Sequence, residues 1–295
     1  MTLKFYNINL NEDRKYLEVA TKYNLAHWMV ADLYHYASSY KDSFNEYEFD
    51  KMLKQYNLAS NIFHEADDQA QFIKGDRKKC LHTLKKYTAL SMEDLRIDTI
   101  FLPTTDSESE EIRDISMASE YYNFSECYKN FLLPESLEYA LLEAMNFFMS
   151  TESKIRELDS QFEFNDIEKN EQLTEDIIVD LMSAKEILDR AISSDAFQDS
   201  LISEFLISAH QDREKVTNEN VKSYISMHIN YIDLWREFFN IQEEIYKNFI
   251  DPANMQDSEI EFNVTQMEQY VSRINKAAIE LNFLILRNMG IKLPH

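Results

Sequence analysis

Glycine is almost absent from the chain, and its scarcity excludes several classes of active site. The 295 residues include two glycines, Gly75 and Gly290, where an average usage of about 7% would give roughly 20. Loops that bind dinucleotides or nucleoside phosphates need several glycines within a few residues, and the nucleophile elbow of serine hydrolases needs two around its serine. The sequence therefore contains none of these three motifs.

Cysteines and long apolar runs are also scarce. Cys80 and Cys127 are too few for a disulfide framework and lack the spacing of metal ligands, so we expect reduced thiols that pack in the interior. The opening MTLKFYNINLNEDRKYLEVATK lacks a basic start followed by an apolar stretch. No uncharged apolar run approaches the roughly 20 residues that span a bilayer. We therefore expect neither export nor membrane insertion, and a cytoplasmic protein.

What the chain does contain is enough apolar material for a folded interior. Hydrophobic residues make up 44% of it and aromatic residues 13%, unlike the aromatic-poor composition of a disordered chain. A chain of this length exceeds one typical core, so we expect two or three packed units. Hydrophobic residues recur mostly at helical spacing, which predicts a mainly α fold.

Acidic residues outnumber basic ones, and the excess lies in the middle of the chain. The net charge of −23 divides into −1 for residues 1 to 100, −17 for residues 101 to 200 and −5 for the remainder. DNA and anionic membrane surfaces repel such a surface, whereas a basic protein attracts it. A solvated acidic face without a partner is the other interpretation. The candidate partner-binding acidic region lies at its start: Glu108, Glu110, Glu111 and Asp114.

The first predicted segment, 1–104, is a mainly helical unit with a little β structure. Its strand candidates are residues 3–10 and 96–103, the second closed by Pro103. A helix is expected to start at Glu12, with Asn11 as its cap, and a second to run from about 45 to 72. Lys74 to Lys86 is expected to be a basic break or a short helix.

An acidic connecting helical region is predicted over 105–172. A helix opening near Pro134 carries an apolar stripe at spacings of four and three: Leu137, Leu141, Ala144, Phe148, Thr151, Ile155 and Leu158. Residues 159–176 are acidic and aperiodic, and we expect the main domain boundary there.

The third predicted segment, 173–295, is an antiparallel helical bundle. Apolar periodicity marks helices over about 177–191, 221–249 and 264–285, and the last two should form a long hairpin over 217–289. The 221–249 helix carries two apolar seams and so needs two neighbours, from the same chain or another copy. The final helix adds candidate self-association residues off its main seam, and we expect a homo-oligomer: Phe283, Leu284 and Leu286.

Sequence signals for catalysis or metal binding are weak. A carboxylate-bridged metal site in a bundle needs Glu-x-x-His on two helices, and only Asp32 with His35 comes near it. HEADD at 64–68 lacks the second histidine of a zinc protease helix. His228 lies on an apolar seam, which favours a core histidine over a base. We expect no catalytic residue, metal or cofactor, so that the protein is not an enzyme.

One basic cluster interrupts the acidic sequence. KGDRKK at 74–79 continues to Lys85 and Lys86, and it suits phosphate or an acidic partner, including a neighbouring copy. A solvated helix face is the simpler interpretation.

Over its full length the chain resembles the Gabija anti-defence proteins, with which phages counter the bacterial Gabija system. The resemblance lies in length, the opening MTLKFYNINLNEDRKYLEVATKYN, the acidic centre and the helical C-terminal part ending ELNFLILRNMGIKLPH. It implies an inhibitor that assembles in several copies around the Gabija complex, which has a nuclease-ATPase subunit and a helicase-like subunit. Enclosure would keep DNA from being bound and cut, in the cytoplasm of the infected bacterial host.

Two other classes of function stay open. The protein is alternatively an acidic nucleic-acid mimic or adaptor that binds a different basic protein. The third class is a helical metalloenzyme, for which Asp32 and His35 are the candidate residues.

Overall fold

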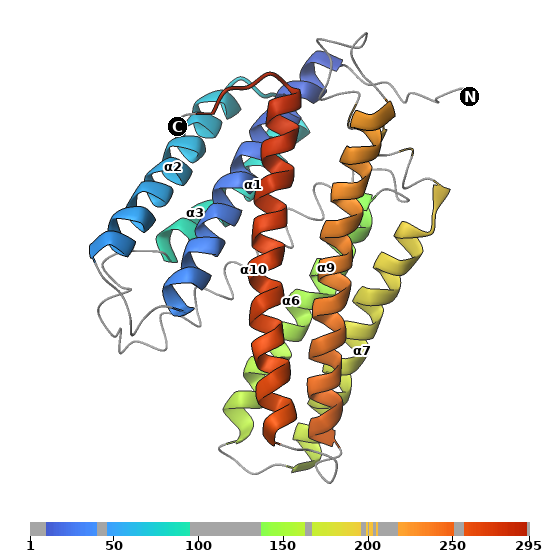
Figure 1. Ribbon diagram of the computed structural model, residues 1–295. Helices are drawn as coiled ribbons and strands as arrows, with labels where there is room; N and C mark the ends of the chain where they lie inside the picture. The colour runs from blue at the N-terminus through green and yellow to red at the C-terminus, as the bar shows by residue number, and fades with distance from the viewer. Residues whose placement is uncertain are drawn as a thin grey trace. The chain divides into compact units, whose positions relative to one another are not determined.

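The computed structural model describes residues 10–39, 46–94, 137–162, 167–195, 199, 201, 202, 205, 218–250 and 257–293. Within these ranges the secondary structure is helical and contains no strand (Figure 1). The helices are α1 (Leu10–Ser39), α2 (Glu46–Ala70), α3 (Asp76–Asp94), α6 (Leu137–Phe162), α7 (Ile167–Ile192), α9 (Asn218–Ile250) and α10 (Asp257–Asn288). The mainly α prediction is therefore confirmed. Both strand candidates lie outside the described residues, apart from Leu10 at the start of α1.

The chain divides into two compact units, each assembled from separate stretches. Unit 1 comprises Met1–Tyr128, Ile202–Tyr224 and Asn275–His295, and unit 2 comprises Lys129–Leu201 and Ile225–Ile274. Helices α9 and α10 each contribute to both units. The predicted segments follow one another along the chain, as 1–104, 105–172 and 173–295. The two units are instead built from stretches that alternate in the sequence.

In unit 1, helices α1, α2 and α3 pack on one another (Figure 1). Lys22 of α1 contacts Glu65 of α2 at 2.7 Å, and Asp32 contacts Gln55 at 3.5 Å. Residue numbers rise in α1 as they fall in α2, so these helices run antiparallel. Residue numbers rise together in α1 and α3 where these two helices contact each other, so they run parallel. The shared interior contains Val19, Ala26, Val30 and Leu33 of α1, Ala59 and Ile62 of α2, and Leu81 and Leu84 of α3.

The helix ends in unit 1 use the two glycines. Gly75 has φ 69° in the turn between α2 and α3, and Gly290 has φ 74° directly after α10, a region that glycine occupies without steric cost. At Gly290 the amide of Ile291 donates to the carbonyl of Leu286 at 3.0 Å, and that of Gly290 to Arg287 at 2.9 Å. This pair of hydrogen bonds is the Schellman motif. Arg14 of α1 donates to the Met289 carbonyl at 2.6 Å, so α1 holds this helix end.

In unit 2, α6 and α7 form an antiparallel hairpin. Lys154 of α6 contacts Asp180 of α7 at 2.6 Å, and only four residues, 163–166, separate the helices. Most of the stretch 159–176, where the sequence predicts a domain boundary, is helical, and unit 2 contains all of it. The sequence did not reveal the start of α7, because the exposed face of this helix is polar and acidic and its apolar stripe begins only at Leu173.

The apolar stripe predicted for α7 is buried, and so is most of the apolar pattern predicted for α9. Ile177, Leu181, Ala184, Leu188 and Ala191 of α7 all lie in the core. On α9 the two seams are buried within the single chain, including Ile232 and Phe239 on one and Leu234 and Phe238 on the other. The second seam is therefore no evidence for another copy. The predicted α9 and α10 hairpin stays a prediction.

Candidate functional site

The polar groups of unit 1 form three adjoining features between α1, α2 and α3. The first is a buried lysine. Lys22 has 0% exposure, and its ammonium contacts Glu18 at 2.9 Å, Glu65 at 2.7 Å and Gln69 at 3.0 Å. An ammonium group has three donors, so every one is used and the lysine is a structural tie between α1 and α2.

A second feature centres on Asp67 of α2. Its carboxylate accepts a hydrogen bond from the Tyr23 hydroxyl at 3.3 Å and pairs with Lys85 of α3 at 2.6 Å. Burial, with the Asp67 charge and hydrogen bond, raises the pKa of Tyr23. The phenol therefore stays protonated and Asp67 joins all three helices.

The third feature is the buried imidazole of His27 on α1. Its Nδ1 lies 3.0 Å from the Ser91 hydroxyl and its Nε2 lies 3.2 Å from that of Tyr87, both on α3. Ser91 uses its own proton to donate to the Thr88 carbonyl at 2.8 Å, so Nδ1 must carry the hydrogen and Nε2 accepts one from Tyr87. Burial lowers the pKa of His27 to about 4. The ring is neutral near pH 7 and supports the packing of α1 on α3.

A shallow hollow of about 360 Å³ opens beside these features in unit 1. It is lined by Asp67 and Asp68 of α2, by Gln71 in the turn after that helix, and by Lys78, His82 and Lys85 of α3. Acidic and basic groups are mixed along its walls, which suits a polar protein surface better than a small apolar ligand.

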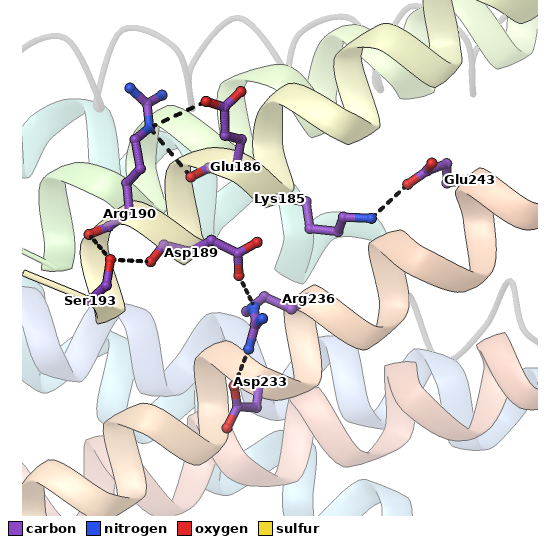
Figure 2. A network of polar contacts seen from close by, with 8 residues as sticks. All are labelled: Lys185, Glu186, Asp189, Arg190, Ser193, Asp233, Arg236 and Glu243. Carbon is purple, nitrogen blue, oxygen red and sulfur yellow. Dashed lines mark hydrogen bonds and ion pairs between the residues drawn. The ribbon is translucent and has the colours of Figure 1, made fainter.

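In unit 2 the charged groups join α7 to α9 (Figure 2). Glu243 of α9 is buried and pairs with Lys185 of α7 at 2.8 Å and with Lys247 of its own helix. Burial alone would raise the pKa of Glu243, but the hydrogen bonds and charges of the two lysines outweigh it, and the pKa is lowered. The carboxylate is thus ionised between two cations.

A second tie lies further along the same helices. Arg236 of α9 contacts Asp189 of α7 at 2.5 Å and Asp233 at 2.8 Å (Figure 2). Burial would lower the pKa of Arg236, but the two aspartates raise it. Numbers fall along α7 as they rise along α9, so the two helices run antiparallel at this contact. Both sets of ion pairs hold α7 and α9 together, so these charged side chains have a structural role.

The aromatic side chains of unit 2 meet where α6 packs on α9. Phe148 of α6 has its ring centroid 5.8 Å from those of Trp235, Phe238 and Phe239 of α9. Offset and edge-to-face ring pairs at such distances stabilise a core. Trp235 is buried and is therefore a core residue.

The structure describes only some of the predicted site residues. Glu108, Glu110, Glu111 and Asp114 lie outside the described residues. Leu286 is fully buried, so its side chain belongs to the core and not to a surface, whereas Phe283 and Leu284 are half-buried. Sequence periodicity places a residue on a helix face but does not show which face a neighbouring helix covers. Self-association through Phe283 and Leu284 stays a prediction.

The candidates weighed for chemistry can also be placed. Asp32 accepts from Gln55, and His228 is buried. Among the residues that the structure describes, no group of three or more metal-ligating side chains forms a possible metal site. In the same part of the chain, no helix is long and apolar enough to cross a bilayer.

The expectation of two reduced thiols is wrong for Cys80. This residue is fully buried in α3 and disulfide-bonded, and Cys127, the only other cysteine of the chain, lies outside the described residues. Structural disulfides are uncommon in a reducing cytoplasm, so the disulfide of Cys80 is unusual for a protein in the predicted cytoplasmic location.

The chain matches no protein-family model, no curated protein and no solved structure.

Proposed function

We propose that this protein is an inhibitor that binds the Gabija nuclease-helicase assembly and blocks its access to DNA in the cytoplasm of an infected bacterium. The observation that carries the proposal is the charge of −17 over residues 101 to 200, taken with the resemblance over the full chain. Several copies would enclose one assembly.

Electrostatics favours a DNA-binding protein as the target. A protein that binds DNA presents a basic groove to the phosphates, and an acidic surface of comparable reach is attracted to the same groove. In unit 2, α7 presents Glu171, Glu175 and Glu186 as exposed side chains. Such a surface repels DNA, so the protein would act on the enzyme and not on its substrate.

The contacts of the described titratable groups favour binding over catalysis. Lys22, His27 and Glu243 are buried among side chains that occupy their donors or acceptors. Each joins two helices of one unit, which is a structural role. A catalytic group usually lies in a cleft and keeps a position open to substrate.

Titration against the target tests the proposal. Increasing amounts of the protein are added to a fixed amount of purified Gabija complex, and DNA binding and DNA cleavage are both measured. Because a stoichiometric inhibitor is used up by its target, cleavage should fall linearly and reach its floor at a fixed molar ratio. Preincubation time should matter little once binding is complete.

Two outcomes would end the proposal. Normal DNA binding and cleavage with the protein in excess would exclude this target. Progressive inactivation by trace amounts of the protein would show turnover and favour the enzyme class. Loss of that activity in the Asp32→Asn and His35→Gln variants would then identify these residues as part of its active site.

The acidic-mimic alternative rests on the same charge and is separated by a different experiment. If acidity alone fills a DNA-binding groove, then reversing Glu108, Glu110, Glu111 and Asp114 to lysine should abolish inhibition, and added salt should weaken it steeply. Enclosure by several copies would survive the reversal with a modest loss of affinity.

A further inference from the structure

The corner between α2 and α3 exposes an aromatic ring and, within a few residues of it in the sequence, basic side chains. Phe72 is 70% exposed. Its amide donates to the Gln69 carbonyl at 3.1 Å, and that of Ile73 donates to Ala70 at 3.1 Å. This tight turn buries Ile73 and leaves Phe72 outside.

Basic residues are concentrated in the sequence next to Phe72. Residues 71–86 contain six basic side chains and one acidic one, in a protein whose net charge is −23. Asp76 pairs with Lys79, whereas Lys74 and Lys78 are exposed and form no ion pair with the residues that the structure describes. We call Phe72, Lys74 and Lys78 the basic corner.

The outer face of α7 has the opposite chemistry. Glu171, Glu175, Val179 and Met182 follow one another at spacings of four, four and three, so they lie on one side of the helix. Val179 is 58% exposed and Met182 is 50% exposed. We call these four residues the acidic face.

The acidic face is unpartnered on the described parts of the chain. Its opposite side carries the buried residues of the α7 core stripe. Asp180 is engaged by Lys154, but Glu171 and Glu175 form no ion pair with the described residues. Two exposed apolar side chains next to two free carboxylates therefore remain available.

We propose that the basic corner of one copy docks on the acidic face of a second copy. The two surfaces match in both respects that an interface requires: Phe72 would cover Val179 and Met182, while Lys74 and Lys78 would meet Glu171 and Glu175. Apolar centres with charged rims are the usual anatomy of interfaces, and complementary charge sets register and partner choice. Copies with a large net negative charge repel one another, and the basic corner supplies a directed attraction.

The contact uses two different surfaces, so it is heterologous. After one contact the first copy still has an unused acidic face and the second still has an unused basic corner, so further copies can add until a ring closes or the chain of copies continues. The inference concerns the protein alone and holds whatever its target is.

Charge reversal on the full-length chain provides the test. Lys74→Glu with Lys78→Glu makes both surfaces acidic, and Glu171→Lys with Glu175→Lys makes both basic. Sedimentation velocity at low ionic strength should show concentration-dependent association of the wild type, weakened roughly tenfold or more in either variant. Raising the salt concentration should weaken the wild-type association.

Mixing supplies the decisive measurement. The two variants carry opposite surfaces, so an equimolar mixture should associate although neither does alone, and a variant with all four reversals should regain association. A control with the same charge change elsewhere, Lys222→Glu with Lys276→Glu, should associate as the wild type does. Circular dichroism establishes that each variant is folded.

The proposal is overturned if the wild type stays monomeric at every concentration, if the control weakens association as much as the corner variant, or if mixing restores nothing. Association through Phe283 and Leu284 instead would leave all the reversals without effect. Normal inhibition of the Gabija complex is measured separately, so failure of one proposal is distinguishable from failure of the other.

Discussion

His27 illustrates how a single residue couples the fold of unit 1 to pH. The neutral ring satisfies both of its nitrogens, because Ser91 accepts from Nδ1 and Tyr87 donates to Nε2. A second proton on Nε2 would face the proton of the Tyr87 hydroxyl in a site that water does not reach. Burial accordingly lowers the pKa of His27 from 6.5 to about 4.

We predict that the wild type loses about 2 kcal/mol of unfolding free energy through His27 between pH 7 and pH 5. The folded pKa lies below the unfolded value, so the unfolded chain binds the proton first as the pH falls from 6.5 toward 4, and folding is penalised in that window. Above pH 6.5 the contribution is fully present. Urea unfolding of the wild type and His27→Gln at both pH values measures the difference.

The control for this prediction is His82, which is exposed on α3. His82→Gln should retain the pH dependence of the wild type, whereas His27→Gln should lose about 2 kcal/mol of it. Equal pH dependence in wild type and His27→Gln would contradict the assignment.

At the scale of elements, the α7 and α9 pair is held by charges at its edge. Glu243 is buried and pairs with Lys185 of α7 (Figure 2) and with Lys247 of its own helix. Hydrogen bonds to a charged partner contribute more than neutral ones, and removing one partner leaves the other without compensation. Exposed pairs such as Glu186 with Arg190 on α7 contribute little by comparison.

Glu243→Gln should therefore lower the unfolding free energy by about 1.5 kcal/mol, because the amide keeps the shape but leaves two lysines without a carboxylate. Glu186→Gln makes the same chemical change at an exposed position and should cost less than about 0.5 kcal/mol. Urea unfolding followed by fluorescence measures both. Equal effects of the two substitutions would show that burial of Glu243 adds nothing.

At the scale of the whole molecule, the two units share helices. Both α9 and α10 pass from one unit into the other without a break in helical structure. Helix formation is cooperative, so loss of structure in one unit should propagate through these helices. The two tryptophans lie in different units, Trp28 in α1 and Trp235 in α9.

Variants with one tryptophan each should then report the same transition. Trp28→Phe leaves Trp235 as the reporter of unit 2, and Trp235→Phe leaves Trp28 as the reporter of unit 1. We predict that the urea midpoints of each variant agree between its fluorescence and its far-UV circular dichroism, the usual evidence of all-or-none unfolding. Separate fluorescence and circular dichroism transitions within either variant would show that the units unfold independently.

Local pattern was sufficient to locate several of the helices. Apolar residues at spacings of three and four gave their positions in α2, α7 and α9, and the buried stripe of α7 from Ile177 to Ala191 was predicted residue by residue. The excess of acidic residues and the basic stretch near Lys78 follow from the sequence alone. These features depend on neighbours along the chain.

Tertiary structure decided everything that depends on residues distant in sequence. Leu286 and the second seam of α9 are apolar whether another copy or the same chain covers them, and only the fold shows that they are buried in one chain. Lys22 of α1 pairs with Glu65 of α2, and His27 of α1 contacts Ser91 of α3, so both depend on residues far away in the sequence. Periodicity determines a helix face, but the element that packs against that face depends on the path of the whole chain.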